Sequence, residues 1–129
     1  MSMTVTPVVA AVAVRDGRFL LAQRMPGKQF ADMWEFPGGK VEAGETLQQA
    51  LERELMEEMG VTARAGDVQH VCMHAGYMIV FLSAEVEGEL HFLEVQDARF
   101  VTPEEARELN MTPQDRLAME HMLSAGRLV

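Results

Sequence analysis

Two apolar runs open the chain, residues 8–14 and 18–24, and an Arg-Asp-Gly segment separates them. Asp-Gly between apolar runs is a strong signal for a tight turn between antiparallel strands. We therefore predict a β-hairpin that ends at Arg24. Residues 25–44 carry several glycines and prolines, which predict a loop with one short strand near residues 34–36.

A helical pattern follows, from Thr46 to Met59. Apolar residues recur there at intervals of three and four, which places them on one face of a helix. The members of this apolar stripe are Leu47, Ala50, Leu51, Leu55 and Met59. Gly60 stands where a helix commonly ends, so we expect an amphipathic helix that packs on a core.

The second half of the chain predicts more strands and two further helices. Residues 68–74 and 77–86 are apolar runs on either side of Ala-Gly, and residues 90–101 are again extended. Thr102 begins a capping box with proline in the first turn of a short helix, and Thr-Pro at 112–113 opens the last helix. Strands and helices interleave without a regular βαβ rhythm, so we expect an α+β fold with a central mixed sheet flanked by helices.

Composition narrows the class of protein. The chain has 129 residues, of which 48% are hydrophobic, so we expect one domain across residues 1–129. The 20 acidic and 11 basic residues give a net charge of −9, which argues against affinity for a nucleic-acid polymer. No apolar run approaches the roughly 18 residues that span a bilayer. The first run also has no basic residues before it, so we expect a cytoplasmic protein without a membrane partner.

An unusual charge arrangement marks the end of the predicted helix. Glu54, Glu57 and Glu58 share one face there, where the helix dipole disfavours each acid by about 0.3–1 kcal/mol. No lysine or arginine follows Arg53 before Gly60. A bound dication reverses the repulsion, and Mg²⁺ commonly binds one or two carboxylates together with substrate phosphates. The cluster therefore indicates a divalent-metal site, and a solvated acidic helix face is the alternative.

The wider pattern around these acids is far more specific. Residues 39–61 read GKVEAGETLQQALERELMEEMGV and resemble the signature of the Nudix hydrolases. Every fixed position of that signature is matched, by Gly39, Glu45, Arg53, Glu54, Leu55, Glu57, Glu58, Gly60 and Val61. The flanking segments LLAQR (20–24) and WEFPGGK (34–40) are similar to the MutT-type branch, whose members cleave nucleoside triphosphates, including oxidised ones. The resemblance implies the Nudix α/β/α sandwich, with its functional box at 39–61.

The resemblance also implies which residues hold metal. The ligands of the divalent cations, Mg²⁺ or Mn²⁺, would be Glu54, Glu57, Glu58 and the Gly39 carbonyl. Arg53 would orient these carboxylates, and an i,i+4 ion pair with Glu57 is the structural alternative. Glu45 would support the loop or the outer shell of the metal.

Metal-assisted attack of water on a pyrophosphate linkage also needs a general base within reach of that water. In MutT-type enzymes a glutamate beyond the central strands lies near the metals, and Glu94 matches it here. An exposed strand residue is the alternative for Glu94. Glu57 and Glu58 compete for the role of base.

Substrate recognition would fall to residues outside the metal cluster. Arg24 corresponds to an arginine near the nucleobase in the MutT-type branch. Glu35 and Phe36 could line the pocket, and Gly38 allows close approach of the backbone to a ligand. At the place of Asp115, the MutT protein has an asparagine that reads oxidised guanine, and CTP-type pyrophosphohydrolases carry aspartate. Aspartate accepts from a cytosine amino group or guanine N–H groups, or it favours the dipole in the first turn of a helix.

Together these features predict a divalent-cation-dependent nucleoside triphosphate pyrophosphohydrolase, which yields a nucleoside monophosphate and pyrophosphate. It would sanitise oxidised or modified nucleotides, such as 8-oxo-dGTP or modified (d)CTP, and so serve DNA repair. The alternatives are a Nudix hydrolase of nucleoside diphosphate derivatives such as ADP-ribose, or a non-catalytic Nudix module that binds nucleotides. The complete set of box acids favours the hydrolase. We expect a monomer or a homodimer.

Overall fold

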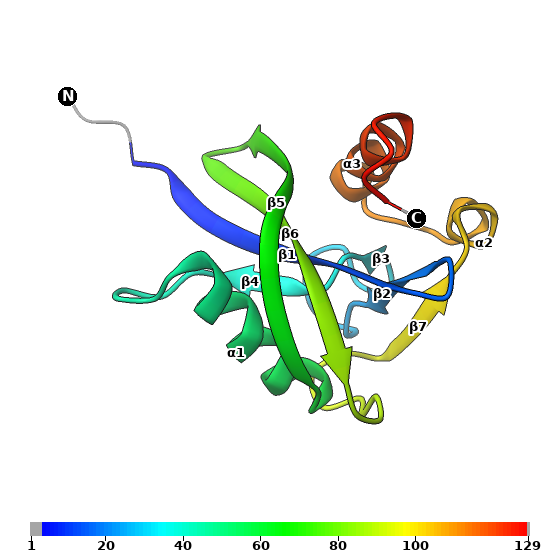
Figure 1. Ribbon diagram of the computed structural model, residues 1–129, viewed down its shortest axis with the longest axis horizontal. Helices are drawn as coiled ribbons and strands as arrows, with labels where there is room; N and C mark the ends of the chain where they lie inside the picture. The colour runs from blue at the N-terminus through cyan, green and yellow to red at the C-terminus, as the bar shows by residue number, and fades with distance from the viewer. Residues whose placement is uncertain (1–3, 129) are drawn as a thin grey trace.

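The computed structural model describes residues 4–128 and shows a mixed β-sheet with helices on both faces (Figure 1). Its elements are β1 (Thr6–Arg15), β2 (Arg18–Gln23), β3 (Trp34–Glu35), β4 (Gly38–Lys40), α1 (Leu47–Met59), β5 (Thr62–His74), β6 (Tyr77–Glu87), β7 (Asp97–Val101), α2 (Pro103–Glu108) and α3 (Pro113–Ser124). The strand order is β3-β2-β1-β6-β5, with β4 paired to β1 and β7 paired to β2. The β1–β6 pair is parallel and the other strand pairs are antiparallel. The expected α+β fold is confirmed.

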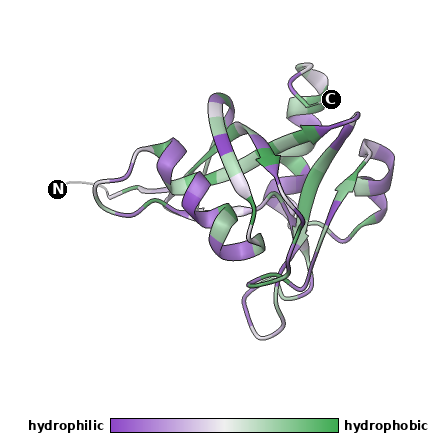
Figure 2. Ribbon diagram, turned by 60° about the horizontal axis from the view of Figure 1, so that its bottom comes forward, coloured by the Kyte–Doolittle hydropathy of each residue, from purple (hydrophilic) through white to green (hydrophobic). Residues whose placement is uncertain are grey.

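The central strand β1 is buried on both faces, because its side chains alternate between two apolar clusters. Val9 and Ala11 belong to the cluster under α1, whereas Ala10 and Val12 belong to the cluster under α3. The predicted apolar stripe of α1 fills the first cluster, and hydrophilic residues occupy the rest of that helix (Figure 2). The layers are thus helix, sheet and helix, as the sequence predicts.

The helix boundaries follow from their caps. The Thr46 side chain accepts from the N–H of Gln49, and the Gln49 side chain accepts from the N–H of Thr46, which completes a capping box. At the other end Gly60 has φ of 67°, the left-handed conformation that glycine favours. Thr102 and Glu105 form a second capping box before α2. Within residues 4–128, no helix is long and apolar enough to cross a membrane.

Strand β5 begins at Thr62, well before the expected start at residue 68. Its first half contains Gly66 and Asp67 among small and polar residues, which obscures the alternation of a strand. The register with β6 shifts twice between Ala65 and His70, so the strand also carries a bulge-like irregularity there. β5 forms one edge of the sheet.

The expected strand at 90–101 is wrong over its first half, because β7 covers only Asp97–Val101. The backbone N–H of His91 bonds the carbonyl of Met59, and the N–H groups of Leu93 and Glu94 bond the carbonyl of Glu58. The last turn of a helix leaves carbonyls without an intrahelical partner. The segment before β7 therefore caps α1 instead of joining the sheet.

The glycine pair forms a short strand, β4, which low strand propensity hides from the sequence pattern. Gly38 lies opposite Ala10 in the antiparallel pairing with β1. A Cβ atom on Gly38 would lie 1.9 Å from the carbonyl oxygen of Val9. Only glycine therefore permits this close approach, which places β4 between the central strand and α1.

Candidate active site

Glu58, in the last turn of α1, is the most unusual carboxylate of the described chain. Its residue is 9% exposed, and Oε2 is a buried atom without a hydrogen-bond partner within residues 4–128. Burial raises the pKa of Glu58 well above its usual value, and the nearby Glu54, Glu35 and Glu94 raise it further. A buried and unpartnered carboxylate oxygen costs stability, so this position indicates function.

Four carboxylates surround a cavity of about 130 Å³ at this end of α1: Glu35, Glu54, Glu58 and Glu94. Glu94 reaches it because its segment is hydrogen-bonded to the carbonyl of Glu58. Burial also raises the pKa of Glu54, against the opposing hydrogen bond from Arg53. The cavity is also lined by two basic residues, Lys28 and Arg24, and by Gly38. The predicted Glu54, Glu58 and Glu94 thus meet in one place.

Arg53 organises the acids beside this cavity. Its guanidinium donates to Glu45 at 2.7 and 2.9 Å, to Glu54 at 3.0 Å and to Glu57 at 3.2 Å. It also donates to the carbonyl of Lys40 at 3.1 Å. The hydrogen bonds to Glu45 raise the pKa of Arg53 above its usual value, with smaller contributions from Glu54. Arg53 therefore ties α1 to the loop that follows β4.

Glu57 lies apart from the other two predicted ligands. Its side chain is 46% exposed, it bonds Arg53, and it does not line the cavity. Its charge still contributes to the raised pKa of Glu54. The i,i+4 ion pair between Arg53 and Glu57, given above as the alternative, is present in the structure.

The donor set fits a hard divalent cation. Within residues 4–128, no three carboxylate, histidine or cysteine side chains are already gathered in a ligating arrangement. Glu54 is instead held by Arg53, and a Cβ on Gly39 would lie 2.5 Å from the Glu54 carboxylate, so the two are in close contact. The free oxygen of Glu58 and the mutual repulsion of the acids are both relieved by a dication, whose preferred ligands are carboxylate oxygens.

A second, larger cavity of about 390 Å³ adjoins the first and shares Arg24 and Glu35 with it. These two side chains form an ion pair at 2.9 Å, yet burial keeps the pKa of Glu35 above its usual value. Gly39 and Asp115 also line this cavity. It is of the size that accommodates a small ligand, about 300–1,000 Å³.

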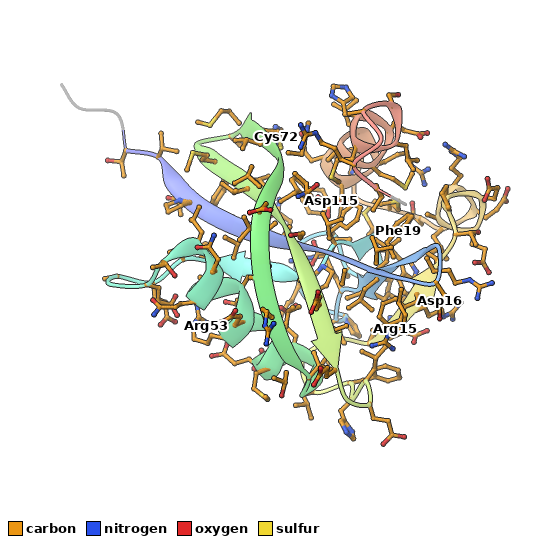
Figure 3. The ribbon with its side chains drawn as sticks, viewed as in Figure 1. Arg15, Asp16, Phe19, Arg53, Cys72 and Asp115 are labelled. Atoms are coloured by element: carbon orange, nitrogen blue, oxygen red, sulfur yellow. The ribbon has the colours of Figure 1, made fainter. Side chains whose placement is uncertain are left out.

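Asp115 connects α3 to the site through a long-range hydrogen bond. Its Oδ2 accepts from the backbone N–H of Phe36 at 2.8 Å. Burial and the charge of Glu35 raise the pKa of Asp115 to about 7, against the opposing effects of Phe36 N–H and Arg24. Asp115 lies in the first turn of α3, where the Thr112 side chain makes no capping hydrogen bond. Figure 3 shows Asp115 on the α3 side of the sheet and Arg53 on the α1 side.

The expectation that the Phe36 side chain lines the pocket is wrong. Phe36 is 3% exposed, and its ring stacks on Phe19 and meets Phe81 edge-on in the core under α3. An apolar ring between two strands gains more from burial than from exposure at a polar cavity. Phe36 therefore contributes to the site through its backbone N–H alone.

Several lining residues were not singled out as site residues from the sequence. Lys28 and Phe30 lie in the loop after β2, and His74 and Tyr77 flank the turn between β5 and β6. Lys40 completes this group, with its ammonium 5.8 Å from the Tyr77 ring centroid. Their signal is positional: Lys28, Phe30, His74 and Tyr77 lie in or beside loops and turns, and Lys40 directly follows the glycine pair.

Comparison with known proteins defines the class. A family profile described as the NUDIX domain matches residues 4–122, so the chain belongs to the Nudix hydrolase family. It is therefore an enzyme that acts on acid anhydrides. Members of the family act on small-molecule nucleotides and typically use divalent cations.

The chain is also similar to individual proteins. The chain is 39% identical to the CTP pyrophosphohydrolase of Escherichia coli over 129 residues, covering 95% of this chain and 94% of that one. It is 56% identical to the 8-oxo-dGTP diphosphatase of Haemophilus influenzae over 57 residues, or 43% and 42% of the two chains. The solution structure of the E. coli ORF135 protein matches with a TM-score of 0.77 and 38% identity, covering 95% of this chain and 91% of that one.

Proposed function

We propose that this protein is a divalent-cation-dependent nucleoside triphosphate pyrophosphohydrolase, which converts a (d)NTP and water into a (d)NMP and pyrophosphate. One observation carries the proposal: the unpartnered Glu58 oxygen lies in a cavity of four carboxylates that shares Arg24 and Glu35 with a nucleoside-sized cavity. The arrangement provides a place for metal and phosphates beside a place for a base. Its physiological role would be to remove oxidised or modified nucleotides, such as 8-oxo-dGTP or modified (d)CTP.

The residues of α1 would hold the metal, Mg²⁺ or Mn²⁺. Glu54 and Glu58 would supply carboxylate oxygens, the Gly39 carbonyl would be an additional ligand, and Glu57 would supply a third carboxylate on release from Arg53. The bound cation would polarise phosphoryl oxygens and lower the pKa of the attacking water. Arg53 positions Glu54 and Glu57 through the hydrogen bonds described above. Glu45 positions Arg53 in turn.

Glu94 is the candidate general base. It lines the carboxylate cavity, its residue is exposed, and its backbone is fixed by the hydrogen bond to Glu58. A base must be accessible to the attacking water and held within hydrogen-bonding reach of it. Glu57 lies outside the cavity, and Glu58 is better suited to metal because its free oxygen is buried. Lys28 would attract the phosphate chain.

Asp115 and Arg24 are the candidate base-reading residues. Within residues 4–128, the Asp115 side chain makes one hydrogen bond, through Oδ2, so its other oxygen is available to the substrate. Because its pKa is about 7, the carboxyl accepts when ionised and both donates and accepts when protonated. The protonated form matches cytosine, which offers an amino donor beside a ring acceptor, and the ionised form matches N–H donors such as those of guanine. We therefore favour a cytosine-containing or oxidised-guanine triphosphate.

The experiment that tests this proposal is a substrate panel with Mg²⁺ in which pyrophosphate and orthophosphate are followed separately. The panel contains the common (d)NTPs, 8-oxo-dGTP, a 5-substituted dCTP and ADP-ribose. Pyrophosphate release concentrated on one or two triphosphates is expected. Turnover of ADP-ribose alone would assign the chain to hydrolysis of diphosphate derivatives, and silence on every compound would indicate a binding module. EDTA should abolish activity and excess Mg²⁺ should restore it.

A further inference from the structure

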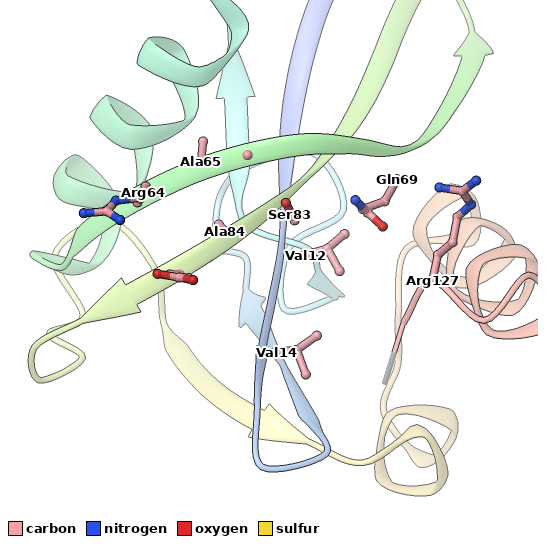
Figure 4. Close-up of a pocket in the computed structure, with 10 residues that line it drawn as sticks. Val12, Val14, Arg64, Ala65, Gln69, Ser83, Ala84 and Arg127 are labelled. Atoms are coloured by element: carbon pink, nitrogen blue, oxygen red, sulfur yellow. The ribbon is translucent and has the colours of Figure 1, made fainter.

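A cavity of about 340 Å³ lies outside the candidate active site, on the half of the sheet face that α3 leaves uncovered. Val12 and Val14 of β1 and Ser83 of β6 line its floor (Figure 4). Arg64 approaches from β5 on one side, and Gln69 and Arg127 approach from the other. Its lining includes neither the acids of the metal cluster nor Arg24, Glu35 and Asp115.

The two arginines of this cavity differ from the others in the described chain. Each of the other described arginines contacts a carboxylate or a backbone carbonyl. These arginines are Arg15, Arg18, Arg24, Arg53, Arg99, Arg107 and Arg116. Within residues 4–128, the guanidinium groups of Arg64 and Arg127 make no hydrogen bond and no ion pair. Glu85 lies directly opposite Arg64 on β6 and also lines the cavity, yet no ion pair joins the two.

Defined backbone geometry holds each arginine at the cavity. Gly126, with φ of 69°, ends α3, and the N–H of Arg127 bonds the carbonyl of Met122 at 2.8 Å. This 6→1 bond after a left-handed glycine is the Schellman arrangement, which fixes the exit of the chain. On the opposite side, the irregularity of β5 follows Arg64 directly. A Cβ on Gly66 would lie 2.7 Å from Ser83 Oγ, so glycine keeps the floor open there.

The shape and charge of the cavity favour one kind of ligand. Its volume is at the lower end of the range for small-molecule sites. The valine floor suits a flat apolar ring, and an arginine guanidinium stacks on aromatic rings as well as binding phosphate. Figure 4 shows Arg64 and Arg127 on opposite sides of Ser83. A ligand with a ring at one end and an anionic group at the other fits this arrangement of valines and arginines.

We propose that this cavity is a second ligand site, which binds an aromatic compound carrying a phosphate, such as a nucleoside monophosphate. Arg127 and Ser83 bind the phosphate, the ring lies over Val12 and Val14, and Arg64 stacks against it. Glu85 accepts from an exocyclic amino group. The choice of a nucleotide rests on the proposed function, because that reaction releases a monophosphate. Arg127 follows α3, whose first turn contains Asp115, so α3 runs between this cavity and the substrate cavity.

The test is a titration of ¹⁵N-labelled protein in EDTA, with the amide signals of Gly66 and Ser83 as reporters. Separate titrations use dCMP, inorganic phosphate, deoxycytidine and phenyl phosphate. dCMP should shift both signals saturably and with about tenfold higher affinity than phosphate or deoxycytidine alone. Comparing the affinity for phenyl phosphate with the affinity for dCMP tells whether the cavity prefers a nucleotide to another aromatic phosphate. Equal affinity for dCMP and inorganic phosphate, or no saturable shift, would overturn the proposal.

Variants separate this cavity from the candidate active site. Arg64→Gln and Arg127→Gln should each weaken the dCMP response at Gly66 and Ser83 by about tenfold or more. Arg18→Gln, an exposed arginine at the start of β2, is the matched control and should bind as the wild type does. A dCMP response unchanged in both cavity variants would refute the site. Because no metal or turnover is involved, failure here leaves the proposed hydrolysis untouched, and the substrate panel tests that separately.

Discussion

The Asp115 carboxylate accepts a hydrogen bond from the backbone N–H of Phe36, across 79 positions of sequence. The bond joins the first turn of α3 to the segment that leads into the glycine pair. Because the Phe36 ring is packed in the core, its N–H is held rigidly toward Asp115. The position of a candidate base-reading carboxyl is thus set by the same core that supports the sheet.

The first prediction concerns stability and pH. The pKa of Asp115 is about 7 in the folded protein, against an ordinary value of 3.8. Since the folded value is the higher one, the contribution of Asp115 to stability is greatest below pH 4 and is lost as pH rises through about 7. The gap corresponds to about 4 kcal/mol as an order of magnitude.

Asp115→Asn should remove this dependence while keeping an acceptor for Phe36 N–H. Urea unfolding of both proteins at pH 5 and pH 8, in EDTA, measures the effect. The free energy of unfolding of the variant should rise relative to the wild type between the two pH values. Parallel pH profiles would contradict the raised pKa of Asp115.

The same substitution should alter substrate preference. Asparagine always presents both an amide donor and a carbonyl acceptor, whereas the carboxyl of Asp115 changes with protonation. Because a misplaced donor leaves a polar group unpaired in a buried site, the ratio of kcat/KM between 8-oxo-dGTP and 5-substituted dCTP should move by about tenfold or more. Gln114→Glu changes a neighbouring residue of the same cavity and is the control for a general charge effect. An unchanged ratio in Asp115→Asn would limit Asp115 to a structural role.

Much of the fold was predictable from local patterns. The hairpin at Arg15-Asp16-Gly17, the apolar stripe of α1 and the capping box at Thr102 are each encoded within a few residues. Tertiary contacts decided the parts that the sequence did not predict. Segment 90–96 has a strand-like composition, but its N–H groups bond the end of α1. β4 forms from glycines because β1 lies alongside.

The candidate site likewise has features that local sequence patterns predict and features that depend on tertiary contacts. The spacing of Arg53, Glu54 and Glu58 in the signature determines their positions on α1, and their roles at the site stay predictions. It could not show that Glu57 stays outside the cavity, or that the Phe36 ring belongs to the core. Those outcomes depend on which part of the protein each side chain contacts after folding. The bond from Phe36 to Asp115 likewise joins segments whose proximity no local pattern encodes.

The third prediction concerns Glu58. Burial and the neighbouring acids oppose the charge of Glu58, whose Oε2 has no hydrogen-bond partner, so Glu58→Gln should raise the free energy of unfolding in EDTA at neutral pH by about 1–3 kcal/mol. Mg²⁺ should stabilise the wild type and leave the variant unchanged, because only a protein that binds the ion gains stability from it. Triphosphate turnover by the variant should fall by about a hundredfold or more.

Glu52→Gln on the same helix is the matched control for Glu58→Gln. Glu52 accepts from the N–H of Ala65, away from the cavity, and glutamine can still accept there. Thermal melts with and without Mg²⁺, together with turnover assays, compare the two. A loss of stability in Glu58→Gln, or full activity in that variant, would contradict the metal role of Glu58.

The two glycines of β4 should respond differently to alanine. In Gly38→Ala the new Cβ would lie 1.9 Å from the Val9 carbonyl oxygen, so the strand pairing must shift and the melting temperature should fall markedly. In Gly39→Ala the nearest atoms, at 2.5 Å, belong to the Glu54 carboxylate, which can rotate away. Gly39→Ala should therefore fold as the wild type does but lose most activity. The reverse order of the two melting temperatures would contradict these contacts.

The last prediction concerns the fork geometry of Arg53. Its guanidinium binds both oxygens of Glu45 and reaches Glu54 and Glu57 with its remaining donors, a pattern that a point charge does not reproduce. Arg53→Lys should thus keep the charge yet release at least one carboxylate. The Mg²⁺ concentration for half-maximal activity should rise by about tenfold, and kcat should fall as well. Arg53→Met should change both quantities more severely.

The control Arg107→Lys alters an exposed ion pair with Glu120 and should leave both quantities unchanged. If Arg53→Lys retained the wild-type requirement for Mg²⁺, the charge alone would suffice and the fork would have no part in positioning the acids.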